Sequence, residues 1–315
     1  MNLKSITSPS ATTYTVAPSK LKIGGVAFAI GSETSGSILS PAGRCGVVGL
    51  RPTFGRVSRH GAMALSWTQD RLGPFARYAE DCALVMRVIA RADSRDMSCV
   101  DLPFNWNAKL DLKTIRVGYL KAAFDENEDP IARERQQATF DAVTKLGFTI
   151  VPVEVPEFTT DVSAINVESA TFFDGLMRSG RDSLLTNPGR ANGWKGERVL
   201  PAVDYLQSQR IRMMMMMKLA EATKHVDVYL GPSNGGAPAP AGGPGGPGGP
   251  GGGGGRQRRQ GAGQRHSAMA NLATYPAVAV PNGFGPTGLP TSLTFFARPF
   301  KETELLAVVK AYQDA

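Results

Sequence analysis

The sequence lacks long apolar runs and has few cysteines. No stretch approaches the roughly 18–20 apolar residues that a membrane span needs, and the first residues are not followed by the apolar segment and cleavage site of a secretory signal. The three cysteines, Cys45, Cys82 and Cys99, are scattered and lack the spacing of metal ligands, which argues against a disulfide framework. These absences predict a cytoplasmic protein with no membrane span, no bound metal and no cofactor.

Acidic residues are outnumbered by basic ones, which gives a formal net charge of +8. Part of this excess is local, because four arginines fall in one short stretch, at Arg256, Arg258, Arg259 and Arg265. The other basic residues are interspersed with acids, as on a solvated surface. There is no aromatic RNA-binding pattern, zinc-finger spacing or basic helix with heptads. Direct nucleic-acid binding is therefore not expected.

A loop of small and polar residues at 31–37 follows directly on the apolar run 26–30. A strand that enters such a loop can place consecutive backbone N–H groups around one point, where they would bind an anion. A serine in the same loop can act as a nucleophile that faces its own oxyanion hole. We predict Ser37 as the nucleophile and the backbone N–H groups of Thr34, Ser35, Gly36 and Ser37 as the oxyanion hole.

The string that begins with this loop, Gly31 to Ser58, resembles the amidase signature family nearly throughout. These are the Ser–cis-Ser–Lys amide hydrolases, related to fatty acid amide hydrolase and to the A subunit of glutamyl-tRNA(Gln) amidotransferase. Their pattern reads Gly-[Ser/Thr]-[Asp/Glu]-Thr-x-Gly-Ser-Ile, then Pro-Ala, and later Pro-Thr-x-Gly-Arg-Val-Ser. Two further segments, 65–77 and 266–296, resemble later family segments. The resemblance covers about 25–235 and 264–315.

The resemblance implies an α/β fold with a mixed central sheet covered by helices. It also implies hydrolysis of a carboxamide C–N bond through a serine nucleophile and an acyl-enzyme, with a small-molecule amide as substrate. The family's lysine and cis-serine motifs are not found upstream, where counting back 24 residues from Ser37 reaches Thr13. We therefore expect a truncated N-terminal portion, with 1–24 a non-matching segment and 25–315 an incomplete amidase signature domain.

No general base can be assigned from the sequence. Lys4, Lys20 and Lys22 lie upstream of Ser37 but are expected to be exposed tail residues. The three histidines, at positions 60, 225 and 266, have no spacing that indicates a relay to Ser37. Glu33, just before the loop, is expected to brace it by accepting backbone N–H groups.

Three functions remain open. The first is an amidase, and the second is a catalytically impaired fragment or pseudoenzyme of the same family. The third is an A-type component of a tRNA-dependent amidotransferase, which would meet nucleic acid only through its partner. A homodimer is also possible.

The hydrophobic periodicity predicts the main secondary-structure elements. Cys82 is expected in the core on the apolar face of a helix, and the methionine run 213–217 is expected to line the core or a pocket. A Gly/Pro-rich tract predicts a disordered loop at about 236–263. The predicted helices are 78–90, 130–146, 162–179 and 201–223, with a loop at 186–196, and the predicted strands are 114–120, 148–153 and 226–232.

Overall fold

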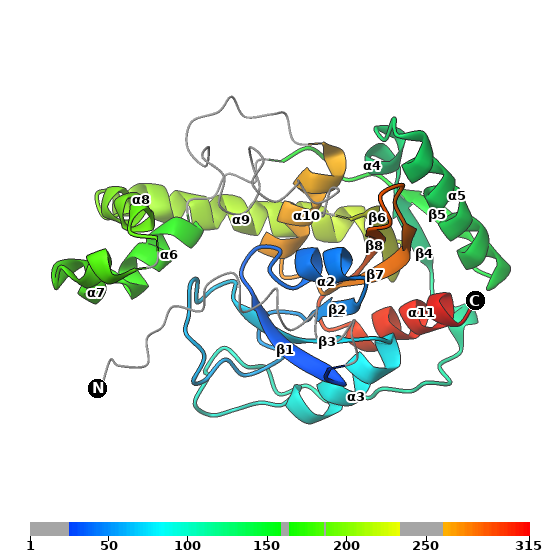
Figure 1. Cartoon of the computed structure of the whole chain (residues 1–315), viewed down its shortest axis with the longest axis horizontal. Coiled ribbons are helices and arrows are strands. Elements are labelled where there is room, and N and C mark those ends of the chain that lie inside the picture. The colour runs from blue at the N-terminus through cyan, green and yellow to red at the C-terminus, as the bar shows by residue number, and fades with distance from the viewer. Residues whose placement is uncertain (1–24, 159–163, 186, 234–260) are drawn as a thin grey trace.

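The computed structural model describes residues 25–158, 164–185, 187–233 and 261–315. In these ranges the chain forms one mixed sheet of eight strands, in the order β1-β3-β2-β7-β8-β6-β4-β5 (Figure 1). The strands are β1 Phe28–Glu33, β2 Val48–Arg51, β3 Arg71–Ala76, β4 Val117–Leu120, β5 Ile150–Val153, β6 Val228–Pro232, β7 Ala277–Phe284 and β8 Pro290–Ala297.

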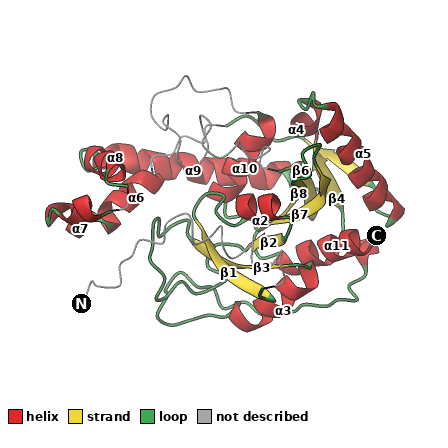
Figure 2. Ribbon diagram, viewed as in Figure 1, coloured by secondary structure: helices red, strands yellow, loops and turns green. Residues whose placement is uncertain are grey.

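Helices cover both faces of this sheet (Figure 2). Helices α3 and α11 pack on one face, whereas α2, α9 and α10 pack on the other. Helices α6, α7 and α8 extend to one side with a small apolar cluster of their own. The helices are α2 Leu39–Cys45, α3 Ala79–Ile89, α4 Lys121–Asp125, α5 Pro130–Lys145, α6 Ala164–Phe172, α7 Asp174–Arg178, α8 Gly189–Glu197, α9 Ala202–Ala222, α10 Ala262–Leu272 and α11 Glu302–Asp314.

The strand pairing changes from antiparallel at the β1 edge of the sheet to parallel at the β5 edge. Strands β1 and β2 both pair antiparallel with β3 and therefore run in the same direction. Helix α2 connects them and lies across the face of the sheet, where it contacts β7 and β8. At the other edge, β4 is parallel to both β5 and β6, with α5 in the connection from β4 to β5. The expectation of an α/β fold with a mixed, helix-covered sheet is confirmed.

Most of the predicted elements are present. The helices predicted at 78–90, 130–146 and 201–223 are α3, α5 and α9. Cys82 is completely buried on α3, as predicted, and burial raises the pKa of its thiol. The predicted segment 1–24 and most of the predicted disordered loop lie outside the described residues. The predicted end of that loop is wrong, because α10 already begins at Ala262.

The region 162–197 differs from the prediction. The helix predicted at 162–179 is two helices that break at Phe173, and the loop predicted at 186–196 contains α8. The Phe173 ring stacks on Trp194 of α8, with centroids 4.5 Å apart. Three glycines lower the helix propensity of α8. Tertiary packing of its Trp194 and Ala191 therefore outweighs local propensity here.

Two smaller predictions are also corrected. The strand predicted from residue 114 begins at Val117, because residues 112–114 form a 3₁₀ turn, in which the Lys113 N–H donates to the Asp111 carboxylate. The methionine run does not lie in the core as a unit: Met215 is buried, whereas Met213, Met214 and Met217 are exposed. Five consecutive helical residues cannot share one face at 3.6 residues per turn.

Candidate active site

Ser37 lies in the loop between the end of β1 and the start of α2. Its side chain is exposed, whereas the following Ile38 and Leu39 are buried against the sheet. Within the described part of the chain, the Ser37 hydroxyl makes no hydrogen bond. The loop thus carries a free hydroxyl at the entrance to a helix that is itself firmly packed.

Glu33 holds the start of α2 in place. Its Oε2 accepts hydrogen bonds from the backbone N–H groups of Ile38, at 2.7 Å, and Leu39, at 3.0 Å. Its Oε1 accepts from Arg51 Nη1 at 3.0 Å, and Arg51 donates in turn to the carbonyl of Tyr275 at 3.1 Å. The predicted bracing role of Glu33 is confirmed, and the structure adds Arg51 as its counter-ion.

The ion pair between Glu33 and Arg51 is buried, with side-chain exposures of 0% and 1%. Burial by itself raises the pKa of Glu33, but the Arg51 guanidinium and the two backbone N–H groups outweigh it, and the pKa is lowered from its ordinary value of 4.5. Glu33 is therefore a carboxylate at neutral pH. A buried and paired charge of this kind tolerates little displacement of its partners.

Thr34 fixes the other side of the loop. Its hydroxyl donates to Asp70 Oδ1 at 2.5 Å, and its carbonyl accepts from Asn271 Nδ2 at 2.7 Å. The second carboxylate oxygen of Asp70 accepts from the backbone N–H groups of Leu65 and Ser66. The loop before Ser37 is thus tied both to the segment before β3 and to the end of α10.

The predicted oxyanion hole lies between these two anchors. The backbone N–H groups of Ser35, Gly36 and Ser37 donate to no acceptor among the described residues. Gly36 has φ +92°, and a Cβ atom at this position would have no heavy atom within 4 Å. Among the described residues there is thus open space on the Cβ side of Gly36. The assignment of these groups, with Thr34, to an oxyanion hole remains a prediction.

The histidines are placed away from any relay to Ser37. His60 is exposed in a loop, and the His225 ring contacts the carbonyl of Pro152 at 3.4 Å. His266 is buried, within 3.1 Å of the Tyr229 hydroxyl. Burial, assisted by the charge of Arg51, lowers the pKa of His266 to about 3. The upstream candidates Lys4, Lys20 and Lys22 and the counted position Thr13 lie outside the described residues.

A buried polar network beside the site was not predicted. Glu168 of α6 is completely buried and accepts from the hydroxyls of Ser66 and Thr68. Arg212 of α9 donates to the carbonyls of Thr68 and Leu272. These contacts tie α6 and α9 to the same 65–70 segment that holds Thr34. The only sequence signal was a charged residue on the buried side of each helix.

Two further observations bear on the site. Among the described residues, no group of three or more His, Cys, Asp or Glu side chains is arranged to hold a metal ion. None of the helices within the described ranges combines the length and apolar character that crossing a membrane requires.

The chain is similar to a known protein family and to curated proteins. The family model described as Amidase matches residues 21–306. The A subunit of the glutamyl-tRNA(Gln) amidotransferase of Synechococcus sp. (strain RCC307) is 33% identical over 316 residues, a match that covers 91% of this chain and 63% of that protein. The chain therefore spans less than two thirds of this curated relative.

Solved structures share the fold. One structure, reported as an unexpected vestigial protein complex that reveals the evolutionary origins of an s-triazine catabolic enzyme, superimposes with a TM-score of 0.75 at 25% identity. That match covers 95% of this chain and 65% of the other. The native peptide amidase of Stenotrophomonas maltophilia gives a TM-score of 0.70 at 22% identity, covering 95% of this chain and 64% of the other.

Proposed function

Because the chain belongs to the amidase family, we propose that it hydrolyses the C–N bond of a carboxamide with Ser37 as the nucleophile. The observation that carries this proposal is one anchored loop that holds an exposed Ser37 hydroxyl and three backbone N–H groups, none of which has a partner among the described residues. A nucleophile and an adjacent set of fixed donors are what acyl transfer through a serine requires.

The proposed reaction has two steps. The Ser37 Oγ forms a bond to the amide carbonyl carbon while its proton passes to a base, and the N–H groups of Ser35, Gly36 and Ser37 stabilise the resulting oxyanion. The C–N bond then breaks and the amine leaves with a proton, after which water attacks the acyl-enzyme and releases a carboxylic acid. One oxyanion donor contributes on the order of 10²–10³-fold to such a rate.

The anchoring of the loop supports this assignment. Donors stabilise a transition state only when they are already oriented before the reaction. Glu33 binds the loop from the α2 side and Asp70 binds it through Thr34. The donors and the Ser37 hydroxyl are therefore held by buried contacts on both sides.

Two alternatives have support of their own. Similarity to the A subunit of the amidotransferase favours an A-type component that works with a tRNA-bound partner. A catalytically impaired form is favoured because the described residues place no lysine or histidine in hydrogen-bond contact with the Ser37 hydroxyl. General-base assistance contributes on the order of 10²–10⁴-fold, so its loss would leave little activity. The cytoplasmic location and the homodimer stay predictions.

The decisive experiment is labelling of the purified protein with a fluorophosphonate probe, followed by mass mapping of the adduct. We expect an adduct on Ser37 that Ser37→Ala abolishes. Ser35→Ala is the matched control, because Ser35 is an exposed serine in the same loop and should leave the labelling in place. A folded protein that remains unlabelled would contradict the proposal and favour the impaired form.

A second measurement separates the amidase from the amidotransferase component. Ammonia release from simple carboxamides by the isolated chain favours the amidase. If ammonia release required a co-purified partner together with tRNA, the amidotransferase hypothesis would replace it.

A further inference from the structure

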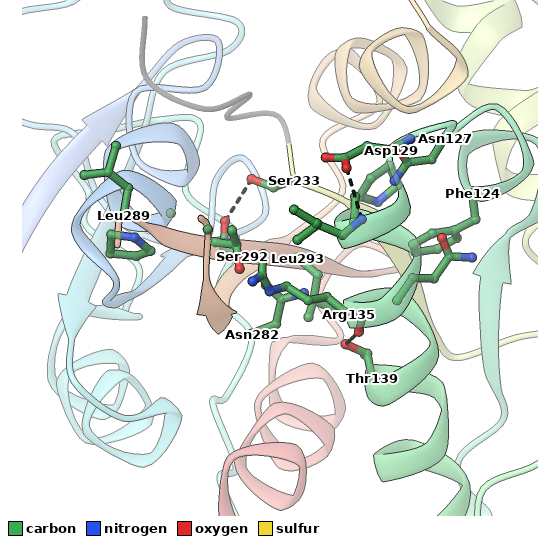
Figure 3. A pocket seen from close by; sticks show the side chains of 18 of the residues that line it. Phe124, Asn127, Asp129, Arg135, Thr139, Ser233, Asn282, Leu289, Ser292 and Leu293 are labelled. Atoms are coloured by element: carbon green, nitrogen blue, oxygen red, sulfur yellow. Dashed lines mark hydrogen bonds between the residues drawn. The ribbon is translucent and has the colours of Figure 1, made fainter. Parts of the chain in front are cut away.

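A pocket lies at the end of α2 that faces away from Ser37. Its volume is about 470 Å³, and its walls come from α4 and α5, the β7–β8 hairpin and the C-terminal part of α2 (Figure 3). Neither Ser37 nor any residue of its loop lines this pocket. From Ser37 to Gly43 at the pocket, the helix spans roughly 9 Å at 1.5 Å per residue. The pocket is therefore separate from the proposed active site.

Arg44 of α2 and Arg135 of α5 are the cations that line the pocket, Asp129 lines it with a carboxylate, and the cation held against the hairpin is Arg135. Its Nη2 donates to the carbonyl of Phe284, which fixes the guanidinium against the hairpin. No carboxylate of the described residues pairs with Arg135, and its Nε and Nη1 have no protein acceptor there. In Figure 3, Arg135 extends toward Asn282 of β7. An arginine held in a cavity without a counter-ion favours an anion, and its planar fork matches a carboxylate.

Uncharged polar groups surround this arginine. Asn282 Oδ1, Gln136 Oε1 and Thr291 Oγ1 are buried and have no hydrogen-bond partner in the part of the chain that the structure describes. Rotation of the amide exchanges its oxygen and nitrogen, so Asn282 can donate as well as accept, and the Thr291 hydroxyl can also donate. Buried polar groups are normally hydrogen-bonded, so three such atoms around one pocket indicate missing partners.

Gly283 makes room for this arrangement. The β7–β8 ladder shifts register between Pro281 and Gly283, and Gly283 has φ +132°. A Cβ atom there would lie 3.2 Å from Arg135 Nε and 3.8 Å from Thr291 Oγ1. Glycine therefore allows the arginine to approach the hairpin, and the irregularity changes the direction of neighbouring side chains. It also shows that the Arg135 and Thr291 polar groups converge on one small region.

The rest of the pocket is largely apolar. Phe124 and Phe140 pack edge to face with ring centroids 5.2 Å apart, and Leu289 and Leu293 come from the hairpin side. Apolar walls with a few convergent polar groups are typical of sites for small organic ligands. Inorganic phosphate would satisfy the arginine but leave these walls without a partner.

We infer that this pocket binds a small organic monocarboxylate with an aromatic or branched apolar body. The carboxylate pairs with Arg135 and accepts from Asn282 and Thr291, and the apolar body packs between Phe124, Phe140 and Leu293. This inference is independent of the proposed function, because it involves neither Ser37 nor acyl transfer.

The test measures binding of 4-fluorobenzoate to the full chain by ¹⁹F NMR titration. The neutral amide 4-fluorobenzamide and inorganic phosphate serve as comparison probes. We expect 4-fluorobenzoate to bind at least tenfold more tightly than either. Arg135→Gln should weaken its binding at least tenfold, and Arg135→Lys should restore part of the affinity. Lys145→Gln, which removes an exposed cation from the same helix outside the pocket, should leave binding unchanged.

Three outcomes would overturn the inference. Equal binding of the amide would mean that the pocket does not recognise the acid, and equal binding of phosphate would mean a plain anion site. Benzoate binding that ignores Arg135→Gln would place the ligand elsewhere. Asn282→Ala provides a milder variant, expected to weaken binding two- to fivefold, and thermal denaturation establishes that each variant is folded. Because Ser37 labelling is not part of this test, its failure would leave the proposed function untouched.

Discussion

The two ends of helix α2 differ in how completely their polar groups are paired. At its N-terminal end, the buried charge of Glu33 is met by Arg51 and by two backbone N–H groups, and Thr34 is bonded through both its hydroxyl and its carbonyl. At its C-terminal end, a cavity is lined by Arg135, which pairs with no carboxylate of the described residues, and by several buried polar atoms without partners in the same ranges.

This difference in pairing suits the N-terminal end to catalysis and the C-terminal end to ligand binding. The N-terminal end uses nearly all of its polar groups to fix the loop and leaves the Ser37 hydroxyl and three N–H groups unpartnered within the described ranges. Such rigidity favours catalysis, because donors must be oriented before the reaction. The C-terminal end leaves its polar groups unsatisfied around a space of ligand size, which favours binding.

The largest effect is expected from Glu33→Gln. Removing this charge leaves Arg51 buried without its counter-ion, and breaking a buried pair in this way costs about 3–5 kcal/mol. Urea denaturation monitored by circular dichroism measures the free energy of unfolding. Glu221→Gln is the matched control, because Glu221, near the end of α9, pairs with Lys224 just beyond that helix, and both side chains are exposed. That pair is worth at most about 1 kcal/mol. If Glu33→Gln and Glu221→Gln lowered the free energy of unfolding by similar amounts, the buried Glu33–Arg51 ion pair would not be what holds the N-terminal end of α2.

Acidification should weaken the same end through His266, which lies near Arg51. The pKa of His266 is about 3 in the folded protein and 6.5 in the unfolded chain, so the unfolded chain binds the proton first. The stabilisation that neutral His266 contributes is fully present above about pH 6.5 and is lost progressively as the pH falls toward 3. Between pH 7 and pH 5 the loss is about 2 kcal/mol.

Urea denaturation at several pH values measures this decline in the parent and in His266→Gln. The variant has no titrating group at this position and should show a shallower loss of stability on acidification. An unchanged slope would show that His266 is not the group that titrates.

The smallest effect compares one threonine from each end. Thr34→Val removes the hydroxyl that donates to Asp70 and should lower the free energy of unfolding by about 1–2 kcal/mol. Thr291→Val replaces a buried hydroxyl that has no partner among the described residues, so it should change stability by less than about 0.5 kcal/mol or raise it slightly. Both substitutions keep the β-branched shape. If the two variants lost equal stability, the contrast between the ends of α2 would fail.

Much of the scaffold could be predicted from local patterns. The periodicity that predicted α3 corresponds to one apolar face along a continuous helix, with Ala79, Cys82, Ala83 and Met86 buried. On α9 the buried residues include Ser208 and Arg212 as well as Met215 and Leu219. The bracing role of Glu33 was also local, because the residues it holds are only five and six positions away. Local predictions failed where packing overrode propensity, as in α8, whose glycines are compensated by the contact between Trp194 and Phe173.

The partners of the loop could not be found in the same way. Asn271 lies 237 positions from Thr34, and Glu168 lies 102 positions from Ser66. Nothing in the local sequence of Asn271 or Glu168 indicates that the one will meet the Thr34 carbonyl and the other the Ser66 hydroxyl. Such pairs exist only after the strands have taken their places in the sheet.

The sequence by itself determined the family, whose resemblance implied the mixed sheet, and the position of Ser37 in a loop that follows a strand, because both depend on contiguous residues. Only the tertiary structure decided that Arg51 is the counter-ion of Glu33 and that His266 is buried beside the Tyr229 hydroxyl. It alone also brought Arg135 of α5 against Gly283 and Thr291 of the β7–β8 hairpin. The physical reason is the same in each case: burial and charge pairing depend on which distant segments the fold brings within a few ångströms.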